Sequence, residues 1–170
     1  MNACAPTAAV QPALFQEAMS RFAGTVTIVS TEVDGRRYGM VATSVCSVSA
    51  EPPTLLVCIN KSASTHDPIV AARHFAVNAL STRHAELVRR FSTMAGEARF
   101  EPGRWNPLTT GAPVLVDAGI ALDCRLIAAH DGFSHTIFVG QVAEAIVSDE
   151  PPPDALLWHR RGLANCSPLF

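Results

Sequence analysis

The sequence predicts a mainly β domain, an antiparallel β-barrel with a few short helices. Segments with strand character outnumber segments with helical periodicity along the chain. No strand–helix–strand repeat of the length that a parallel sheet needs is present. The 170 residues, 48% of them hydrophobic, can bury one core of ordinary domain size. These patterns favour a closed antiparallel barrel built as a single domain.

The N-terminal part predicts a helix followed by a hairpin. Apolar residues recur three and four positions apart over 12–22, which is the spacing of an amphipathic helix. Residues 25–31 and 37–49 both have strand character, and the Asp34-Gly35 pair between them is a strong turn signal. We therefore expect the two strands to pair with each other.

A short buried strand and a polar loop come next. Pro52-Pro53 ends the preceding strand, and the apolar run 54–59 predicts a strand that is buried on both faces. Residues 60–65, Asn-Lys-Ser-Ala-Ser-Thr, are polar and predict a loop.

The middle of the chain predicts two helices around one strand. Residues 67–73 begin with Asp-Pro and predict a short helix, 75–80 predict a strand, and 82–91 have helical periodicity again. Residues 92–111 contain several Gly and Pro residues and predict an irregular segment. Loops of this length are usually functional, so we expect a lid or a partner contact.

A second long hairpin is predicted in the C-terminal part of the chain. Residues 120–128 alternate in polarity, 130–134 predict a turn, and 135–147 predict a long strand. The prolines at 151–153 end that strand, and an apolar and basic cluster follows at 156–161.

Composition excludes several classes of function. The formal net charge of −2 gives no basic surface for nucleic acid, and no apolar run is long enough to span a membrane. Five scattered cysteines without a Cys-x-x-Cys pair indicate reduced thiols, as in a cytoplasm. Residues 1–11 lack the features of a signal peptide and predict a disordered lead-in.

The sequence lacks the common catalytic and metal-binding motifs. It has no Gly-x-Ser-x-Gly, no His-Glu-x-x-His and no Gly-rich phosphate loop after a strand. Its six histidines do not occur at metal-ligand spacing, so we expect no metal site.

Two segments around the strand 54–59 are suited to a nucleotide-like cofactor. Residues 40–49 carry small hydroxyl side chains beside backbone donors that could approach a flat, heteroatom-rich ring. The loop 60–65 supplies Lys61 and several hydroxyls that could hold a phosphate. Alternatively, the hydroxyls satisfy the rim of the barrel and Lys61 is a solvated loop residue.

Several short segments follow one another in a specific order. They are Phe22-Ala-Gly-Thr-Val-Thr-Ile-Val29, Gly39-Met-Val-Ala-Thr-Ser44, Ser47-Val-Ser49, Pro52-Pro53, Cys58-Ile-Asn-Lys-Ser-Ala-Ser-Thr65, Phe75-Ala-Val-Asn78, Arg99-Phe100, Gly111-Ala-Pro113 and His135-Thr-Ile-Phe-Val-Gly-Gln-Val142. In this order the chain resembles the flavin reductase-like family of FMN-binding split barrels. The resemblance extends from Phe15 to Leu163 and is strongest to short reductase components of two-component flavin monooxygenases.

The resemblance implies a fold, an activity and partners. The fold is a split barrel formed by one domain over 12–170, and the protein is a homodimer with flavin near the subunit interface. The activity is hydride transfer from NADH or NADPH to FMN or FAD, and the reduced flavin passes to a partner monooxygenase. A hydride transfer of this kind depends on positioning, so no catalytic side chain is expected.

The resemblance also assigns residues to the two ligands. Flavin-binding residues would be Met40, Val41, Ala42, Thr43, Ser44, Ser47, Val48, Cys58, Ile59, Asn60, Lys61, Ser62, Ser64, Thr65 and Phe100. Nicotinamide-binding residues would be His135, Trp158, His159, Arg160 and Gly162. The turn before His135 departs from the family pattern, because Gly132-Phe133-Ser134-His135 stands where Gly-Asp-His is usual.

Two other functions remain open at this point. One is an enzyme like pyridoxamine phosphate oxidase, although such sequences bring more arginine to the flavin phosphate. The other is a flavin or haem carrier without turnover. The arginines at 36, 37, 160 and 161 could meet the 2′-phosphate of NADPH or be solvated, so the sequence does not choose between the nicotinamides.

Overall fold

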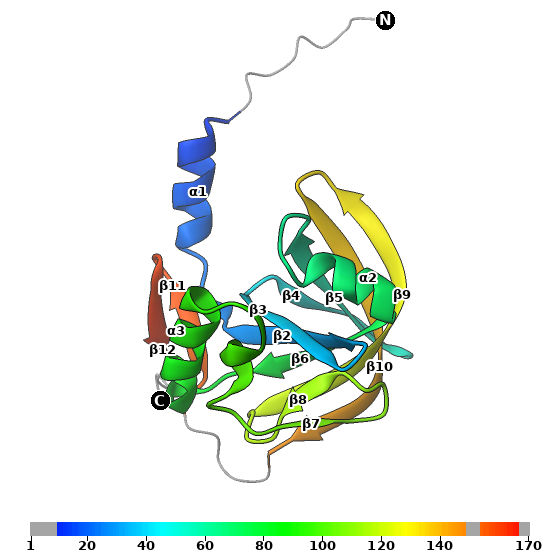
Figure 1. The fold of residues 1–170 in the computed structure, drawn as a ribbon. Coiled ribbons are helices and arrows are strands. Elements are labelled where there is room, and N and C mark those ends of the chain that lie inside the picture. Colours follow the sequence, from blue (N-terminus) through cyan, green and yellow to red (C-terminus); the bar gives the residue numbers. More distant parts are fainter. Residues whose placement is uncertain (1–9, 149–153, 167–170) are drawn as a thin grey trace, which may run out of the picture.

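A computed structural model of the chain describes residues 10–148 and 154–166. Figure 1 shows a curved antiparallel sheet with helices on its outside, and one helix, α1, that projects from the rest of the molecule. Nearly all of the predicted lead-in at 1–11, and the prolines at 151–153, lie outside the described residues.

The described residues form mostly strands. The strands are β1 (Gly24–Thr25), β2 (Thr27–Val33), β3 (Arg36–Ala42), β4 (Val45–Ala50), β5 (Pro53–Asn60), β6 (His74–Ala79), β7 (Trp105–Pro107), β8 (Pro113–Leu115), β9 (Ile120–Gly132), β10 (His135–Val147), β11 (Leu156–His159) and β12 (Gly162–Asn165). The α-helices are α1 (Pro12–Ser20), α2 (His66–Ala72) and α3 (Ala85–Thr93), and the 3₁₀ helices are η1 (Thr82–His84) and η2 (Gly96–Phe100). The mainly β prediction is confirmed. No helix in the described part of the chain is long and apolar enough to cross a lipid bilayer.

Seven strands form one antiparallel sheet in the order β3-β2-β6-β9-β10-β5-β4. The two edge strands, β3 and β4, follow each other in the chain and are connected by Thr43 and Ser44. Among the described residues no ladder joins β3 to β4. The barrel is therefore split, as the family resemblance implies, and the expectation of a closed barrel from pattern alone was wrong.

Two clusters of buried side chains lie on either side of this sheet. One packs under α3, η2 and the β7–β8 hairpin, and the other fills the concave side. The first contains Val26, Ile28, Leu80, Val88, Phe91, Phe100 and Leu115, and the second contains Val29, Leu55, Val57, Ile59, Phe75 and Phe138. β2 separates them and has buried residues on both faces, which explains its β-branched composition.

Gly39 of β3 allows an aromatic cluster to pack closely against this strand. A Cβ atom at Gly39 would lie 2.8 Å from Phe91 and 3.0 Å from Phe100. Phe91 and Phe100 pack edge to face, with ring centroids 5.1 Å apart, and Trp105 contacts both rings. The aromatic cluster can therefore sit directly on β3.

Two predicted boundaries were wrong. The expected strand 37–49 is interrupted at Thr43-Ser44, because the chain passes there from one edge of the split barrel to the other. The expected turn 130–134 is shorter, since β9 continues to Gly132. Only Phe133 and Ser134 turn the chain, and Phe133 has a positive φ of 64°.

The segment 92–111 is structured, contrary to the expectation of an irregular lid. It contains the last residues of α3, η2 and β7, and it buries Phe100. The tail after 153 also forms a hairpin, β11–β12, which pairs with β1 through Gly24 and Trp158. Its turn residues, Arg160 and Arg161, both have positive φ and are not residues typical of such a turn.

Candidate functional site

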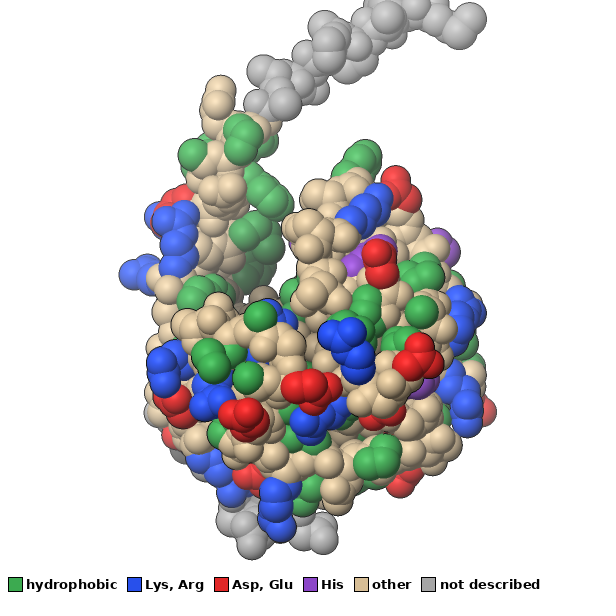
Figure 2. All heavy atoms as spheres, in the orientation of Figure 1, with side chains coloured by type: hydrophobic (Ala, Val, Ile, Leu, Met, Phe, Trp, Pro, Cys, Tyr) green, Lys and Arg blue, Asp and Glu red, His purple; other side chains and the backbone are tan. Residues whose placement is uncertain are grey.

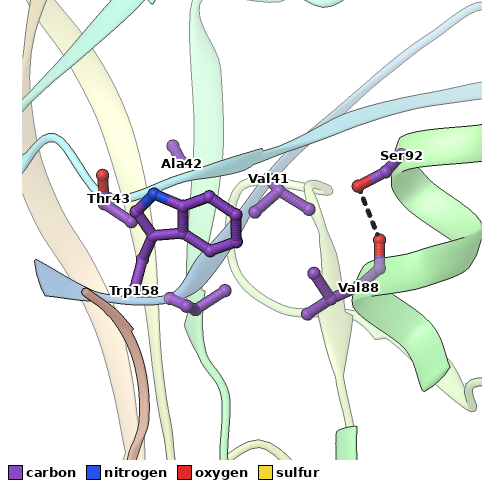
Figure 3. Close-up of a pocket in the computed structure, with 7 residues that line it drawn as sticks. Val41, Ala42, Thr43, Val88, Ser92 and Trp158 are labelled. Atoms are coloured by element: carbon purple, nitrogen blue, oxygen red, sulfur yellow. Dashed lines mark hydrogen bonds between the residues drawn. The ribbon is translucent and has the colours of Figure 1, made fainter. Parts of the chain in front are cut away.

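An apolar pocket lies where β3, α3 and β11 meet. Its lining residues are Val26, Val41, Ala42, Thr43, Val88, Ser92 and Trp158, and its volume is about 240 Å³. Figure 3 shows the indole of Trp158 beside Val41, Ala42 and Thr43, opposite Val88 and Ser92 of α3. Three predicted flavin residues thus lie beside one residue predicted to contact nicotinamide.

Backbone contacts fix the walls of this apolar pocket. The hydroxyl of Thr27 donates to the carbonyl of Ala42 at 2.7 Å. Gly24 is paired with Trp158, and a Cβ atom at Gly24 would lie 3.1 Å from Cβ of Thr43. The indole is therefore held near Thr43 by the pairing of β1 with β11.

The predicted ring-binding segment forms an open sheet edge. The hydroxyl of Ser44 donates to the carbonyl of Cys58 at 2.8 Å, and the amide of Cys58 donates to the carbonyl of Ser44 at 3.1 Å. Beyond this contact β4 pairs only with β5 in the described part of the chain, and Ser47 and Val48 are exposed. The outer backbone groups of β4 are thus free to meet a ligand.

The polar loop 60–65 forms a tight turn around one side chain. The amide oxygen of Asn60 accepts hydrogen bonds from the amide of Ser62 at 2.9 Å and from its hydroxyl at 2.8 Å. Thr65 is fully buried, and its hydroxyl has no hydrogen-bond partner among the described residues.

Lys61 of this loop is engaged by the neighbouring hairpin. Its ammonium forms an ion pair with Asp131, and its amide donates to the carbonyl of Ser134 at 3.0 Å. The hydrogen bond from Lys61 lowers the pKa of Asp131. The only charge that sequence reasoning assigned to a phosphate is thus paired with a carboxylate.

A second pocket, rich in arginine, opens beside the same loop. It has a volume of about 210 Å³ and is lined by Arg36, Arg37, Tyr38, Gly39, Ser64, Gly96 and Arg99. Ser64 was predicted to bind the flavin phosphate, whereas Arg36, Arg37 and Arg99 were not. Arg99-Phe100 belongs to the family pattern, but only Phe100 was predicted to bind flavin.

The three arginines have different partners. Arg37 pairs with Glu97 at 2.7 Å, and its guanidinium lies 4.8 Å from the ring centroid of Phe100. Partial burial opposes ionisation of Glu97, but hydrogen bonds from Arg37 outweigh it and lower the pKa of Glu97. Arg99 donates to the carbonyl of Gly39 at 2.9 Å.

Arg36 has no ion-pair partner among the residues described and lies 5.9 Å from the centroid of the Tyr38 ring. Because three arginines line the pocket and Glu97 is the one carboxylate paired with any of them among the described residues, the pocket keeps an excess of positive charge. Such a pocket suits a phosphate dianion.

Some predicted flavin residues are buried in the core. Phe100 is 1% exposed and packs against Phe91 and Trp105, so its ring supports Arg37 and is closed to a ligand. Ile59 is also fully buried, with its side chain in the core of the barrel. Met40 and Val41 are half-buried at the edges of the two clusters.

The residues predicted to bind nicotinamide fall into two separate groups. His135 begins β10, pairs with Asn60 at the start of the loop 60–65, and contacts the hydroxyl of Ser134 through Nδ1 at 2.9 Å. The other four residues, Trp158, His159, Arg160 and Gly162, belong to β11–β12 or its turn. Figure 1 shows this hairpin at the left of the molecule and the β9–β10 turn at its top, well apart from each other. One chain therefore does not bring the two groups together.

Comparison with known proteins decides the family. The model of the family described as "Flavin reductase like domain" matches residues 19–167. The chain belongs to this family. The flavin reductase-like domain thus covers both pockets, the loop 60–65 and the β11–β12 hairpin.

Relatives with names and solved structures agree with this assignment. The chain is 40% identical over 148 residues to the FMN reductase (NADH) RutF of Agrobacterium fabrum, covering 86% of this chain and 84% of that protein. The nitrilotriacetate monooxygenase component B homolog of Mycobacterium thermoresistibile superposes with a TM-score of 0.86 at 26% identity, covering 91% and 86% of the two chains. The NADH:FAD oxidoreductase SgcE6 of Streptomyces globisporus also gives 0.86, at 28% identity, covering 96% and 100%.

Proposed function

We propose that this protein is an NADH-dependent FMN reductase that hands reduced flavin to a partner monooxygenase. The observation that carries this proposal is the pair of pockets along β3, one apolar and one rich in arginine. The relative with 40% identity is named FMN reductase (NADH), which favours FMN and NADH over FAD and NADPH.

The described residues fit a flavin mononucleotide. The open backbone edge of β4 and the segment from Met40 to Thr43 offer donors and an apolar surface to the ring. Ser64 and Arg36 offer a hydroxyl and a guanidinium to its phosphate. Only three residues separate Gly39, in the arginine pocket, from Thr43, in the apolar pocket, so one ligand could reach both.

A bound flavin supplies the redox chemistry, because its ring accepts a hydride from a reduced nicotinamide. The residues of this chain supply binding and orientation. Val41 and Val88 provide apolar walls that exclude water, and Trp158 offers an aromatic face on which a flat ring can stack. Amides at the β4 edge can stabilise negative charge that develops on the ring during reduction.

A homodimer explains the two separate nicotinamide groups. His135 and the β11–β12 hairpin can serve one nicotinamide if they come from different subunits. We place the protein in the cytoplasm, where NADH and an oxygenase partner are both available. The structural relative named component B is by its name one part of a monooxygenase, which supports transfer of reduced flavin between proteins.

Anaerobic mixing of the purified protein with FMN and excess NADH tests the proposal. We expect the flavin absorbance near about 450 nm to bleach in a reaction that depends on protein concentration. FAD and NADPH, tested in the same assay, should give lower kcat/KM values. Flavin binding without bleaching would overturn the proposal in favour of a carrier without turnover.

A further inference from the structure

A third cleft lies between η1–α3 and the end of β8. It shares no lining residue with the two pockets along β3, and its volume is about 180 Å³. This volume is below the ~300 Å³ at which pockets for drug-sized ligands begin, so the cleft is too small for a second flavin or a dinucleotide. The lining residues are Arg83, His84, Glu86, Leu87, Pro102, Gly103, Leu115 and Asp117.

His84 brings an unused hydrogen-bond donor to this cleft. The amide of Ser81 donates to Nδ1 of His84 at 3.1 Å, so the proton of the neutral ring is on Nε2. Burial lowers the pKa of His84, and the ring is therefore neutral at pH 7. The side chain is only 6% exposed, and Nε2 has no hydrogen-bond partner among the described residues. An unpaired buried N–H is costly, so a ligand oxygen that accepts from it is strongly favoured.

A guanidinium and a carboxylate lie beside this donor. Oδ2 of Asp117 is 3.4 Å from Nε2 of His84, and Arg83 donates to the backbone carbonyl of Asp117 at 3.4 Å. Arg83 forms no ion pair within the described part of the chain. Glu86, in contrast, already accepts two hydrogen bonds from Arg89. The groups that the cleft offers to a ligand are therefore one cation, one neutral N–H and one carboxylate.

We propose that this cleft binds a free α-amino acid with an aliphatic side chain. The carboxylate of the amino acid accepts from Nε2 of His84 and from Arg83, and its ammonium group donates to Asp117. The ammonium nitrogen and a carboxylate oxygen of an α-amino acid are about 3 Å apart, which matches the 3.4 Å between Nε2 and Oδ2. This site goes beyond the proposed reductase activity and does not depend on it.

The apolar part of the cleft determines the kind of side chain. Leu87, Leu115 and Pro102 offer aliphatic surface to the ligand. A Cβ atom at Gly103 would lie 2.9 Å from Cδ1 of Leu115 and 2.5 Å from Nε1 of Trp105, so this wall of the cleft requires glycine. At ~30 Å³ for each water-sized group, the cleft has room for about six such groups, which suits valine or leucine.

Ligands with a single charge fit this cleft less well. An anion would meet the carboxylate of Asp117, and a cation would meet Arg83 and leave the N–H of His84 unpaired. Figure 2 shows basic and acidic side chains interspersed over the face on which Figure 1 places α3 and the β7–β8 hairpin, so neither sign of charge dominates there. A zwitterion has a partner for each of its charged groups.

Isothermal titration calorimetry of the full chain with L-leucine tests this site. We expect saturable binding of one leucine per chain with a Kd below about 1 mM. Two analogues, 4-methylpentanoate without the ammonium group and 3-methylbutylamine without the carboxylate, should each bind at least tenfold more weakly. Asp117→Asn and Arg83→Gln should each weaken leucine binding at least tenfold, because each removes one charged partner.

Matched controls and the opposite outcomes complete the test. Asp34→Asn and Arg125→Gln change exposed residues outside the cleft and should bind leucine as the wild type does. No saturable binding up to about 10 mM leucine, or equal affinity for either analogue, overturns the proposal. Wild-type affinity in a folded Asp117→Asn or Arg83→Gln variant also overturns it, and circular dichroism checks the folding of both. The bleaching assay for the reductase is unaffected by any of these results.

Discussion

The ammonium of Lys61 is ion-paired with the carboxylate of Asp131, 70 positions later in the chain. This contact connects the loop 60–65 to the turn that leads into His135. Both side chains are substantially exposed, and solvent screens exposed ion pairs so that they contribute little to stability. The pair can therefore open at little cost when a phosphate offers Lys61 a stronger partner.

Replacement of Lys61 by alanine should weaken flavin binding more than catalysis. A phosphate contact distant from the reacting ring stabilises ground and transition states alike, so KM for FMN should rise roughly tenfold while kcat stays within a few-fold. Steady-state kinetics with FMN and with riboflavin, which lacks the phosphate, measure this. Asp131→Asn is the control and should not raise KM for FMN. An unchanged KM for FMN in Lys61→Ala would place the phosphate away from this side chain.

Arg36 should contribute more than Lys61 to recognition of the phosphate. Its guanidinium lines the same pocket as Ser64 and pairs with no carboxylate among the described residues. Losing a charge-assisted hydrogen bond of about 1.5–3 kcal/mol should raise KM for FMN roughly ten- to a hundredfold in Arg36→Ala. Riboflavin kinetics should be nearly unaffected. Equal losses with FMN and riboflavin would argue for a general structural role of Arg36 and against a phosphate contact.

His135 should act on the nicotinamide and not on the flavin. His135→Ala should lower kcat/KM for NADH by roughly ten- to a hundredfold, an effect of about 1–3 kcal/mol, with flavin affinity unchanged. Ser134→Ala removes the hydrogen-bond partner of Nδ1 and keeps the imidazole, so it serves as the control. A lower melting temperature with normal NADH kinetics would show instead that His135 only supports the hairpin.

The buried His84 should make stability fall in mild acid. Burial lowers the pKa of His84, although Asp117, 3.4 Å from Nε2, opposes this. The unfolded chain then binds a proton near pH 6.5 more readily than the folded chain. The stabilisation is complete above about that pH and is lost as pH falls below it. Urea midpoints at pH 7.5 and 5.5 measure this loss, and His84→Gln should show a smaller difference between them. Equal pH dependence in both proteins would contradict this role.

Gly39→Ala should destabilise the domain by about 1–3 kcal/mol. The added methyl group would lie within 3.0 Å of two buried rings, Phe91 of α3 and Phe100 of η2. Urea denaturation measures the loss. Gly162→Ala is the matched control, because its nearest new contact is an ordinary 3.8 Å, and it should change stability by less than about 0.5 kcal/mol.

Local sequence signals predicted most of the strands but not where the sheet divides. Alternation and the Asp34-Gly35 turn correctly gave the β2–β3 hairpin, because such signals act between neighbours in the chain. No local signal marks the interruption at Thr43-Ser44. It depends on where the two edge strands, β3 and β4, lie in the folded sheet. The β11–β12 turn was missed because Arg160 and Arg161 adopt positive φ without the Gly or Asn that usually marks it.

Local sequence signals likewise predicted only part of the two pockets. The loop 60–65 and the segment from Met40 were recognisable as candidates from their composition and from the family pattern. The arginine pocket joins residues near 36, 64 and 99, and only folding brings these together. A solvated arginine and a ligand-binding arginine have the same appearance in a sequence, so Arg36 and Arg99 could not be assigned.

The pairing of Gly24 with Trp158 also has a consequence for biosynthesis. It joins strands 134 positions apart, a contact of very high sequence separation, and such contacts form late in folding. The apolar pocket has no Trp158 wall until the last strands have left the ribosome. A nascent or truncated chain that ends before Leu156 would expose the β1 edge and the apolar residues beneath it, so it would be a target for chaperones before it could bind any ligand.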